Sequence, residues 1–517
     1  MTPTAFTDLI SIVDARRVSA TEDLDQRKRA AFGQFMTPPA VSALMASMYL
    51  HSQSHSKSEI RLLEPGAGVG SLTTAFVVSC CRLADRPRKI SATLFEIDEA
   101  LASTLSESLS DVRCVCEKAG VVFEFEVKNE DFIRASTQWN GPLFDNPLGE
   151  FDYVVMNPPY RKINTDSDTR AMLRVVGIET SNLYSAFMML GARALAKGGE
   201  FVSITPRSFC NGPYFRPFRK EFLRTIALDR LHIFESREQA FKEDEVLQEN
   251  IILHGIKNGD RQKVVISTSG KDSNIRSRTV PYTNVIAPDD TEAFIHVISD
   301  ANDDLIREAM FQFKHSLTDL GLNVSTGRVV DFRATEFLRT EISKDTVPLI
   351  YASDFKDGYV EEPKPPYDRP FAIIDSPETR DSLLIETAVH VLVKRFSSKE
   401  EARRIVAAVL EPSRISTKRI GIENHLNYFH QQGSGLSKTF AIGLAAFLNS
   451  TIVDRFFRQF NGHTQVNATD LRSMRYPSIQ ELEWLAEKSE GKITDQQRID
   501  ELMVDLLKLK TSMLKSA

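Results

Sequence analysis

The tetrapeptide Asn157-Pro158-Pro159-Tyr160 directly follows the apolar run Phe151–Met156, which predicts a buried strand. The Asn157 side chain and the Pro158 backbone each present a carbonyl oxygen, and this pair can accept both hydrogens of a planar amino group. When such an amino group is attached to an aromatic base, its nitrogen is a poor nucleophile because the lone pair is delocalised into the ring. Two hydrogen-bond acceptors would draw this nitrogen toward tetrahedral geometry. The prolines fix φ and keep both oxygens aimed, while Tyr160 can stack on a base. An ordinary proline turn after a strand is the alternative interpretation.

A glycine loop follows an earlier apolar run. Residues Leu62–Gly70 predict a strand that carries Glu64, ends in a loop with Gly66 and Gly68, and leads into a helix. Glycines let the backbone turn sharply and approach a ligand where a Cβ would collide. The spacing is Gly-x-Gly-x-Gly, which differs from the Gly-x-Gly-x-x-Gly of dinucleotide-binding proteins. A plain strand-to-helix turn is the alternative.

The next two predicted strands also end in acids, at Glu96-Ile97 and Asp131-Phe132. Glu96 is placed to accept hydrogen bonds from ribose hydroxyls. Asp131 can accept one from an adenine amino group, and Phe132 offers an apolar face to the ring. Carboxylates at three strand ends suit the cationic sulfonium and ammonium groups of S-adenosylmethionine, which has no pyrophosphate that needs a helix N-terminus. Asn157 completes the predicted cofactor site. The alternative interpretation is that these acids are ordinary solvated side chains at strand ends.

The elements that must position these residues follow from the chain as a whole. The 517 residues are 42% hydrophobic and 26% charged, with a formal net charge of -6, which predicts two or three globular domains and excludes disordered, collagen-like and disulfide-stapled classes. Short apolar runs alternate with helical stretches in the first half, so the predicted fold class is α/β, a Rossmann-like sheet with helices on both faces. We predict a catalytic domain over 1–265, a linker over 266–300, a second, mixed α/β domain over 301–480 and a helical tail over 481–517.

Composition also limits where the protein acts. The five cysteines form no Cys-x-x-Cys pair and predict buried free thiols, without a metal site: Cys80, Cys81, Cys114, Cys116 and Cys210. The N-terminus lacks a basic-then-apolar signal pattern, and no apolar run approaches the ~20 residues that a bilayer requires. We therefore expect a cytoplasmic protein without membrane association.

Positive charge is concentrated in one part of the chain. Residues 391–480 contain 13 Lys or Arg against six acids, although the whole chain is acidic. A local basic surface is what phosphate binding requires, and a solvated mixed-charge face is the alternative. Within this part, Phe460–Arg472 is a dense polar stretch whose Gln, Asn, His and Arg side chains could contact base edges. It could equally be a local loop in which Asn467 or Thr469 caps a helix from Asp470.

With these motifs in this order, the sequence resembles the gamma-class N6-adenine DNA methyltransferases of type II restriction–modification systems, of the PstI/BsuBI type. Gly33–Pro39 resembles their N-terminal cofactor cap, and the resemblance implies that Thr37 and Pro38 close over the methionine part of the cofactor. It also implies that Phe241 stacks on the extruded base opposite Tyr160, with Pro159 beside the base. In the second domain it implies a target-recognition role. Thr326-Gly327-Arg328 is a weaker candidate, for contact with the DNA backbone. Further candidates for DNA contact are Lys394, Arg395, His463, Gln465, Asn467 and Arg472.

The resemblance implies a site-specific methyltransferase that moves a methyl group from S-adenosylmethionine to N6 of adenine. A duplex adenine is buried in the stack, so the base must be flipped into the pocket. The expected partners are double-stranded DNA and a separately encoded restriction endonuclease, with the enzyme itself a monomer. Three alternatives remain open: N-methylation of RNA or of a protein glutamine, methylation of cytosine N4, and a non-catalytic DNA-binding or antirestriction module.

Overall fold

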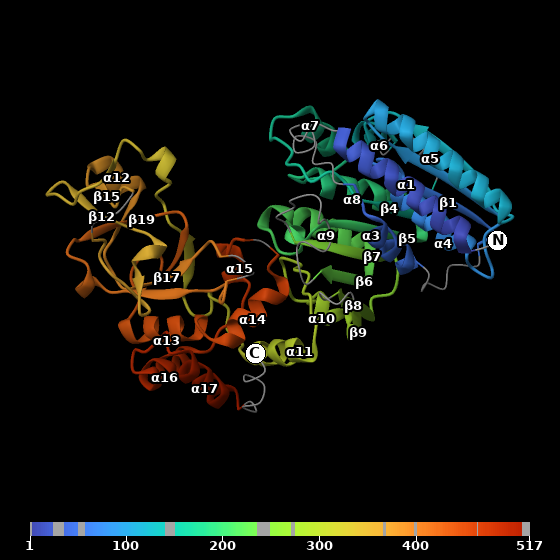
Figure 1. Ribbon diagram of the computed structural model, residues 1–517. Helices are drawn as coiled ribbons and strands as arrows, with labels where there is room; N and C mark the ends of the chain where they lie inside the picture. The colour runs from blue at the N-terminus through green and yellow to red at the C-terminus, as the bar shows by residue number, and fades with distance from the viewer. Residues whose placement is uncertain are drawn as a thin grey trace. The chain divides into compact units, whose positions relative to one another are not determined.

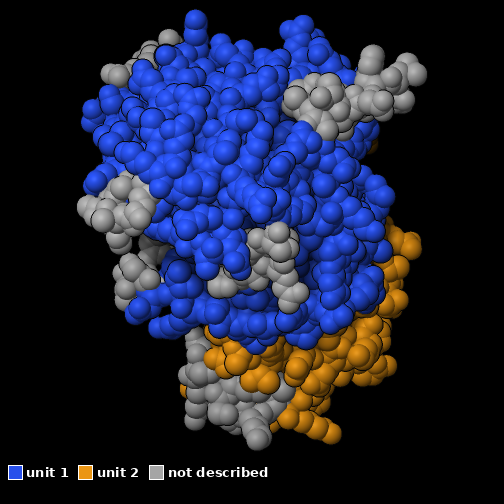
Figure 2. Space-filling view, turned by 90° about the vertical axis from the view of Figure 1, so that its right-hand side faces the viewer, with its two compact units in different colours: residues 1–299 blue, residues 300–517 orange. Residues whose placement is uncertain are grey.

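The computed structural model describes residues 3–23, 36–49, 57–139, 150–234, 249–269, 274–364, 369–397, 401–462 and 464–508. The chain divides into two compact units, Met1–Ser299 and Asp300–Ala517 (Figure 2). Each unit has its own sheets and helices, and each is described by itself.

Over its described residues the first unit contains a nine-stranded sheet in the order β3-β2-β1-β4-β5-β7-β6-β8-β9 (Figure 1). The first five strands run parallel, and β7 is antiparallel to both of its neighbours, β5 and β6. The strands are β1 (Glu59–Pro65), β2 (Lys89–Phe95), β3 (Val122–Lys128), β4 (Phe151–Met156), β5 (Leu195–Pro206), β6 (Ile226–Phe234), β7 (Asn250–Lys257), β8 (Lys263–Ser269) and β9 (Ile275–Pro281).

Helices cover both faces of this sheet, because neighbouring residues of a strand point to opposite sides and both sides are apolar. Leu62 and Val155 belong to a core cluster with α1, α3, α4 and α5, whereas Leu63 and Val154 belong to a second cluster with α6, α7, α8, α9 and α10. The predicted α/β class is therefore confirmed. The helices are α1 (Pro3–Asp23), α3 (Pro39–Tyr49), α4 (Ser71–Cys81), α5 (Glu99–Lys118), α6 (Phe132–Trp139), α7 (Asp168–Val175), α8 (Leu183–Ala194), α9 (Arg216–Thr225) and α10 (Tyr282–Val285).

Helix α8 ends at Ala194, because Leu195 already pairs with Phe151 as the first residue of β5. One boundary differs from that expected. The segment 266–300, predicted as a linker, contains the end of β8, all of β9 and α10, and it belongs to the first unit. Strands β8 and β9 form an antiparallel pair.

The second unit is also mixed α/β in its described part. It has a six-stranded sheet in the order β10-β20-β17-β18-β14-β13 and a five-stranded sheet in the order β11-β15-β12-β19-β16. The strands are β10 (Asn323–Thr326), β11 (Leu338–Arg339), β12 (Thr346–Ile350), β13 (Phe355–Lys356), β14 (Tyr359–Val360), β15 (Ala372–Ile374), β16 (Leu384–Glu386), β17 (His390–Lys394), β18 (Ala407–Leu410), β19 (Arg419–Ile422) and β20 (Leu426–His430). The helices are α11 (Ala301–Gln312), α12 (Pro377–Ser382), α13 (Lys438–Leu448), α14 (Thr451–Phe460), α15 (Ala468–Arg472), α16 (Ile479–Ser489) and α17 (Gln496–Leu507).

The C-terminal helices are part of the second unit and do not form a separate tail. A Cβ at Gly443 of α13 would lie 1.8 Å from the carbonyl oxygen of Leu482 in α16, so only glycine allows these two helices to pack this closely. The last described helix is α17, whose N-cap Asp495 accepts a hydrogen bond from the Arg498 backbone.

Three findings bear on the expectations about thiols, metals and membranes. Cys114 is exposed on α5, whereas the other four cysteines are buried as predicted, because Cys114 lies on the helix face that points away from the core. Within the described ranges, no group of three or more His, Cys, Asp or Glu side chains could hold a metal ion. No single described helix is long and apolar enough to cross a membrane; α13 and α14 pass this test only as a bent pair, and both contribute many buried residues to the unit's core.

Candidate active site

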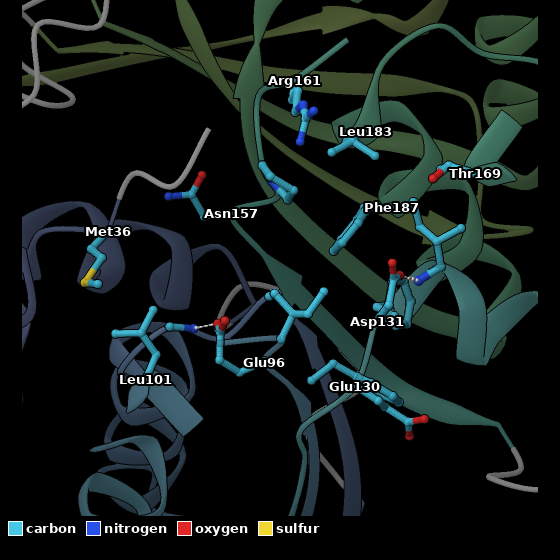
Figure 3. A pocket seen from close by; sticks show the side chains of 17 residues that line it. Met36, Glu96, Leu101, Glu130, Asp131, Asn157, Arg161, Thr169, Leu183 and Phe187 are labelled. Atoms are coloured by element: carbon cyan, nitrogen blue, oxygen red, sulfur yellow. Dashed lines mark hydrogen bonds between the residues drawn. The ribbon is translucent and has the colours of Figure 1, made fainter. Parts of the chain in front are cut away.

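A pocket opens at the carboxyl ends of β1, β2, β3 and β4 in the first unit, where the loops that follow these strands converge (Figure 3). In parallel sheets this edge is the usual place for ligand binding. The cavity has a volume of about 260 Å³. Its lining includes seven of the residues predicted to bind the cofactor, namely Gly66, Gly68, Glu96, Ile97, Asp131, Phe132 and Asn157, together with Pro159.

The glycine loop forms the floor between β1 and α4. Gly66, Gly68 and Gly70 all have positive φ, at 74°, 55° and 88°, a region that L side chains rarely adopt. The backbone N–H groups of Gly66 and Ala67 both donate to the Phe95 carbonyl, which ties the loop to the end of β2. A Cβ at Gly70 would lie 2.8 Å from Leu105 Cδ1, so this position also needs glycine for the contact between the loop and α5.

The two acids at the ends of β1 and β2 have different surroundings. Glu96 lines the pocket, and its carboxylate accepts hydrogen bonds from the Gly68 N–H at 2.8 Å and the Asp98 N–H at 3.0 Å. Burial raises the pKa of Glu96, although these backbone donors oppose the shift. Glu64 is 1% exposed, is absent from the lining, and accepts from both the backbone N–H and the hydroxyl of Thr73. Burial raises the pKa of Glu64 to about 8. Glu64 therefore holds the first turn of α4, and its direct contact with the cofactor stays a prediction.

An aromatic wall closes the other side of the pocket. Phe132 packs against Phe95 at 5.2 Å and against Phe187 at 5.1 Å between ring centroids. Asp131 precedes α6, and its carboxylate accepts from the backbone N–H of Ile133 at 2.7 Å. In Figure 3 this bond is drawn beside Phe187, which points into the cavity from α8.

Asn157 follows β4, and both ends of its side-chain amide are engaged. Nδ2 donates to Thr37 Oγ1 at 3.0 Å, and Oδ1 accepts from the Tyr160 hydroxyl at 3.0 Å. The same hydroxyl lies 3.2 Å from the Ile204 carbonyl oxygen. Burial raises the pKa of Tyr160, so its hydroxyl remains protonated and able to donate. An amide oxygen can accept two hydrogen bonds, so the contact with Tyr160 does not by itself prevent Oδ1 from accepting one from a substrate.

The structure describes only part of the cofactor-cap segment Gly33–Pro39. Thr37 is buried beside Asn157, and the Pro38 carbonyl accepts from the Ser42 backbone at the start of α3. Neither residue lines the pocket, whereas the preceding Met36 does. Phe241 and the first residues of the cap motif, up to Phe35, lie outside the described residues.

Several pocket residues escaped the sequence analysis. Phe187 lines the pocket from α8, and nothing in the sequence distinguishes an apolar residue that faces a ligand from one that faces the core. Arg161 directly follows the tetrapeptide, and its proximity was the available signal. The remaining lining residues are Met36, Phe95, Leu101, Glu130, Ile133, Thr169 and Leu183.

The residues present fit S-adenosylmethionine. A cationic, adenine-bearing ligand needs carboxylates near its ribose and charged end and an apolar wall for its ring. The pocket supplies the buried Glu96 carboxylate on the loop side, and Asp131 with the faces of Phe132 and Phe187 on the other.

The candidate DNA-contacting residues of the second unit have mixed surroundings. Lys394 is in an ion pair with Glu401 at 2.8 Å, and Arg472 donates to the Val324 carbonyl at 2.7 Å. Asn467 is the N-cap of α15 and donates from its backbone to Asp470 at 2.9 Å, as the local alternative predicts. Arg395 donates to the Asn424 carbonyl at 2.9 Å and lies 3.5 Å from Gln465 Oε1. His463 lies outside the described residues.

Comparisons with known proteins show the family to which the chain belongs. Residues 73–241 match the Eco57I restriction-modification methylase family. The type II methyltransferase M.PstI of Providencia stuartii is 40% identical over 96% of this chain and 97% of its own length, and M.BsuBI of Bacillus subtilis is 41% identical over 97% and 99%. The solved structure of the type IIL restriction-modification enzyme MmeI in complex with DNA has the same fold, with a TM-score of 0.59 at 12% identity, covering 94% of this chain and 78% of that one. The chain belongs to the type II methyltransferases of restriction–modification systems, of the PstI/BsuBI type.

Proposed function

We propose that this enzyme methylates N6 of adenine at a specific site in duplex DNA, with S-adenosylmethionine as its cofactor. One observation carries the choice of an amino nitrogen as the methyl acceptor. The Asn157 side-chain amide donates from its nitrogen to Thr37, so the amide oxygen is the atom presented as a hydrogen-bond acceptor. A donor at that place would repel an amino group, whereas an oxygen beside the Pro158 carbonyl can bind both of its hydrogens.

The chain's own residues would act by positioning. When bound, the cofactor supplies an electrophilic methyl carbon. Asn157 Oδ1 and the Pro158 carbonyl accept the two amino hydrogens and direct the nitrogen lone pair out of the ring plane. Tyr160 contributes by holding Asn157 Oδ1 through its hydroxyl, and stacking of its ring on the base stays a prediction. A strong general base is not needed, because the nitrogen becomes acidic once it has formed the new bond and can release a proton to water.

The same geometry supports the following roles in cofactor binding. Glu96 would hold the ribose, since its carboxylate lies at the end of β2 and lines the pocket. Asp131 and the rings of Phe132 and Phe187 would receive the adenine moiety. Met36, which lines the pocket, would contact the methionine part, and the contact expected of Thr37 stays a prediction.

Because the target nitrogen of a duplex adenine is inside the base stack, the reaction requires base flipping. We infer that Phe241 stacks on the flipped base, as the family resemblance implies. The remaining parts of the proposal follow from this function: the second unit recognises the target sequence, the enzyme acts as a monomer in the cytoplasm, and the methylation protects DNA from a separately encoded endonuclease.

Sequencing that detects modified bases in DNA from cells that express the protein tests the proposal. We expect N6-methyladenine at one short sequence, and none in DNA from cells that express Asn157→Ala. N4-methylcytosine at the site would overturn the choice of base. Methylated RNA or protein with unmodified DNA would overturn the choice of substrate. Fluorescence of 2-aminopurine at the target position tests flipping, and we expect Phe241→Ala to reduce it while cofactor binding is retained.

A further inference from the structure

The second unit contains arginines that lack a carboxylate partner. Among its described residues, several basic side chains are in ion pairs with acids, as for Arg380, Arg414, Arg419, Lys438, Arg455 and Arg458. Arg328, Arg333, Arg369 and Arg395 are among the described arginines that have no such pair. We call these four residues the arginine edge.

The loops that carry the arginine edge are tied to one another. The Asn424 N–H donates to the Val329 carbonyl at 2.8 Å, and the Asn424 carbonyl accepts from Arg395 at 2.9 Å. Arg369 lies 4.0 Å from the centroid of the Tyr351 ring, and the Tyr351 hydroxyl donates to Asp331 at 3.2 Å. These contacts join segments that are distant in sequence.

Arg328 lies after β10 and is held by a further contact of this kind. Its guanidinium donates to the Leu384 carbonyl at 3.3 Å. The adjacent Gly327 must be glycine, because a Cβ there would lie 2.2 Å from the carbonyl oxygen of Glu423. Bonds to carbonyls orient a guanidinium without neutralising its charge, so the positive charge stays available to phosphates.

Acids near the arginine edge have other partners. The Asp331 carboxylate accepts from the Tyr351 hydroxyl. Glu423 is 1% exposed, and its carboxylate accepts from the His425 backbone at 2.8 Å and lies 3.0 Å from the His425 ring nitrogen Nδ1. Neither acid is within ion-pair distance of the four arginines.

Phe332 lies between Asp331 and Arg333 in the chain, in one of the segments that these contacts hold. It is 75% exposed, whereas the other exposed large apolar side chains described in this unit, Leu305, Ile342 and Ile479, are 37%, 38% and 41% exposed. It belongs to the short helical turn Asp331–Arg333, whose backbone is fixed by the bonds from Arg333 and Ala334 to the Val330 carbonyl. The Arg333 guanidinium lies 5.4 Å from the centroid of the Phe332 ring. An exposed aromatic ring is therefore held in solvent beside a cation.

We propose that the arginine edge binds the phosphates of duplex DNA and that Phe332 stacks on a base face as an apolar wedge. Aromatic and apolar side chains inserted between bases stabilise locally unstacked DNA. Extrusion of a target base leaves unstacked base faces that such a ring can cover. This inference rests on the proposed function, since it assumes that DNA is the substrate, and it adds the surface and the residue that would make the contact.

Binding of a duplex that contains the methylated sequence, measured by fluorescence anisotropy over a range of salt concentrations, tests the inference. We expect Phe332→Ala to weaken binding about tenfold, with an unchanged slope of log affinity against log salt, and Phe332→Trp to restore it. Arg333→Gln and Arg369→Gln should each reduce that slope by about one. Ile479→Ala, an exposed apolar residue of α16 outside the arginine edge, is the matched control and should bind as the wild type does.

Photocrosslinking locates the contact directly. With 5-iodouracil placed in turn along the duplex, we expect a crosslink at Phe332 that is absent in Phe332→Ala. Wild-type affinity and flipping in Phe332→Ala would overturn the role of Phe332 while leaving DNA methylation intact. Unchanged slopes of log affinity against log salt in both arginine variants would overturn the proposal that the arginine edge binds phosphates. Failure of the proposed function would be seen separately, as an absence of DNA methylation by the wild-type enzyme.

Discussion

The Asn157 side-chain amide donates from Nδ2 to Thr37 Oγ1 at 3.0 Å, across 120 positions of sequence. This bond joins the segment that precedes α3 to the tetrapeptide after β4. In this arrangement Nδ2 is directed to Thr37 and Oδ1 to Tyr160. The orientation of the proposed catalytic acceptor thus depends on the cofactor-cap segment.

Replacing Asn157 with Ala removes one of the two proposed acceptors. We expect methyl transfer to be abolished while the dissociation constant for S-adenosylmethionine changes only a few-fold, because the other pocket residues remain. Transfer of radiolabelled methyl groups and calorimetric titration of the cofactor measure the two effects. Asn164→Ala, an exposed asparagine of the same loop, is the control. Native methylation by Asn157→Ala would contradict the assignment.

Replacing Thr37 with Val keeps its shape but removes the acceptor for Asn157 Nδ2. A buried donor left without its partner costs about 1–3 kcal/mol, so we expect kcat to fall by about tenfold. Thr37→Ser retains a hydroxyl and should restore the rate. Steady-state kinetics with both substrates separates kcat from KM. Equal rates for the Val and Ser variants would show that the hydroxyl does not position Asn157.

Replacing Phe187 with Leu removes an aromatic face of the pocket while retaining an apolar side chain in α8. We expect the dissociation constant for S-adenosylmethionine to rise by about tenfold, since an aromatic pair contributes about 0.5–1.5 kcal/mol beyond its buried area. Phe222→Leu is the matched control, because Phe222 is buried in the same core cluster but does not line the pocket. Calorimetric titration that finds the same affinity in both variants would exclude Phe187 from cofactor binding.

Glu64 makes the stability of the enzyme depend on pH. Burial raises its pKa from 4.5 to about 8, so between these values the folded state binds a proton that the unfolded state has released. The contribution of Glu64 is therefore fully present below pH 4.5 and is lost as the pH rises to about 8, by an amount on the order of a few kcal/mol. Glu64→Gln, which does not ionise, should become more stable relative to the wild type between pH 5 and pH 8.

Urea unfolding followed by circular dichroism at several pH values measures this difference. Glu59→Gln, at an exposed position of the same strand, should show no pH-dependent difference from the wild type. A constant difference between Glu64→Gln and the wild type from pH 5 to pH 8 would mean that Glu64 keeps its charge in the folded state.

Local patterns were enough to predict the strands of the catalytic sheet and much of its site. Strands β1, β2 and β4 contain short apolar runs, β3 alternates apolar and charged residues, and residues of distinct chemistry follow three of them, namely Glu96, Asp131 and Asn157. Because parallel strands end at one edge, the order of these residues in the sequence already predicts that they meet around one cavity.

The sequence by itself determined the α/β class, the type of ligand pocket and the acceptor motif, because these depend on residue type and on periods of two or 3.6 residues. Only the tertiary structure decided that Glu64 holds Thr73 instead of lining the pocket, that Phe187 faces the cavity, and that segment 266–300 belongs to the first unit. These outcomes depend on the direction of a side chain relative to distant segments. Local sequence does not encode that direction, because packing and long-range hydrogen bonds set it.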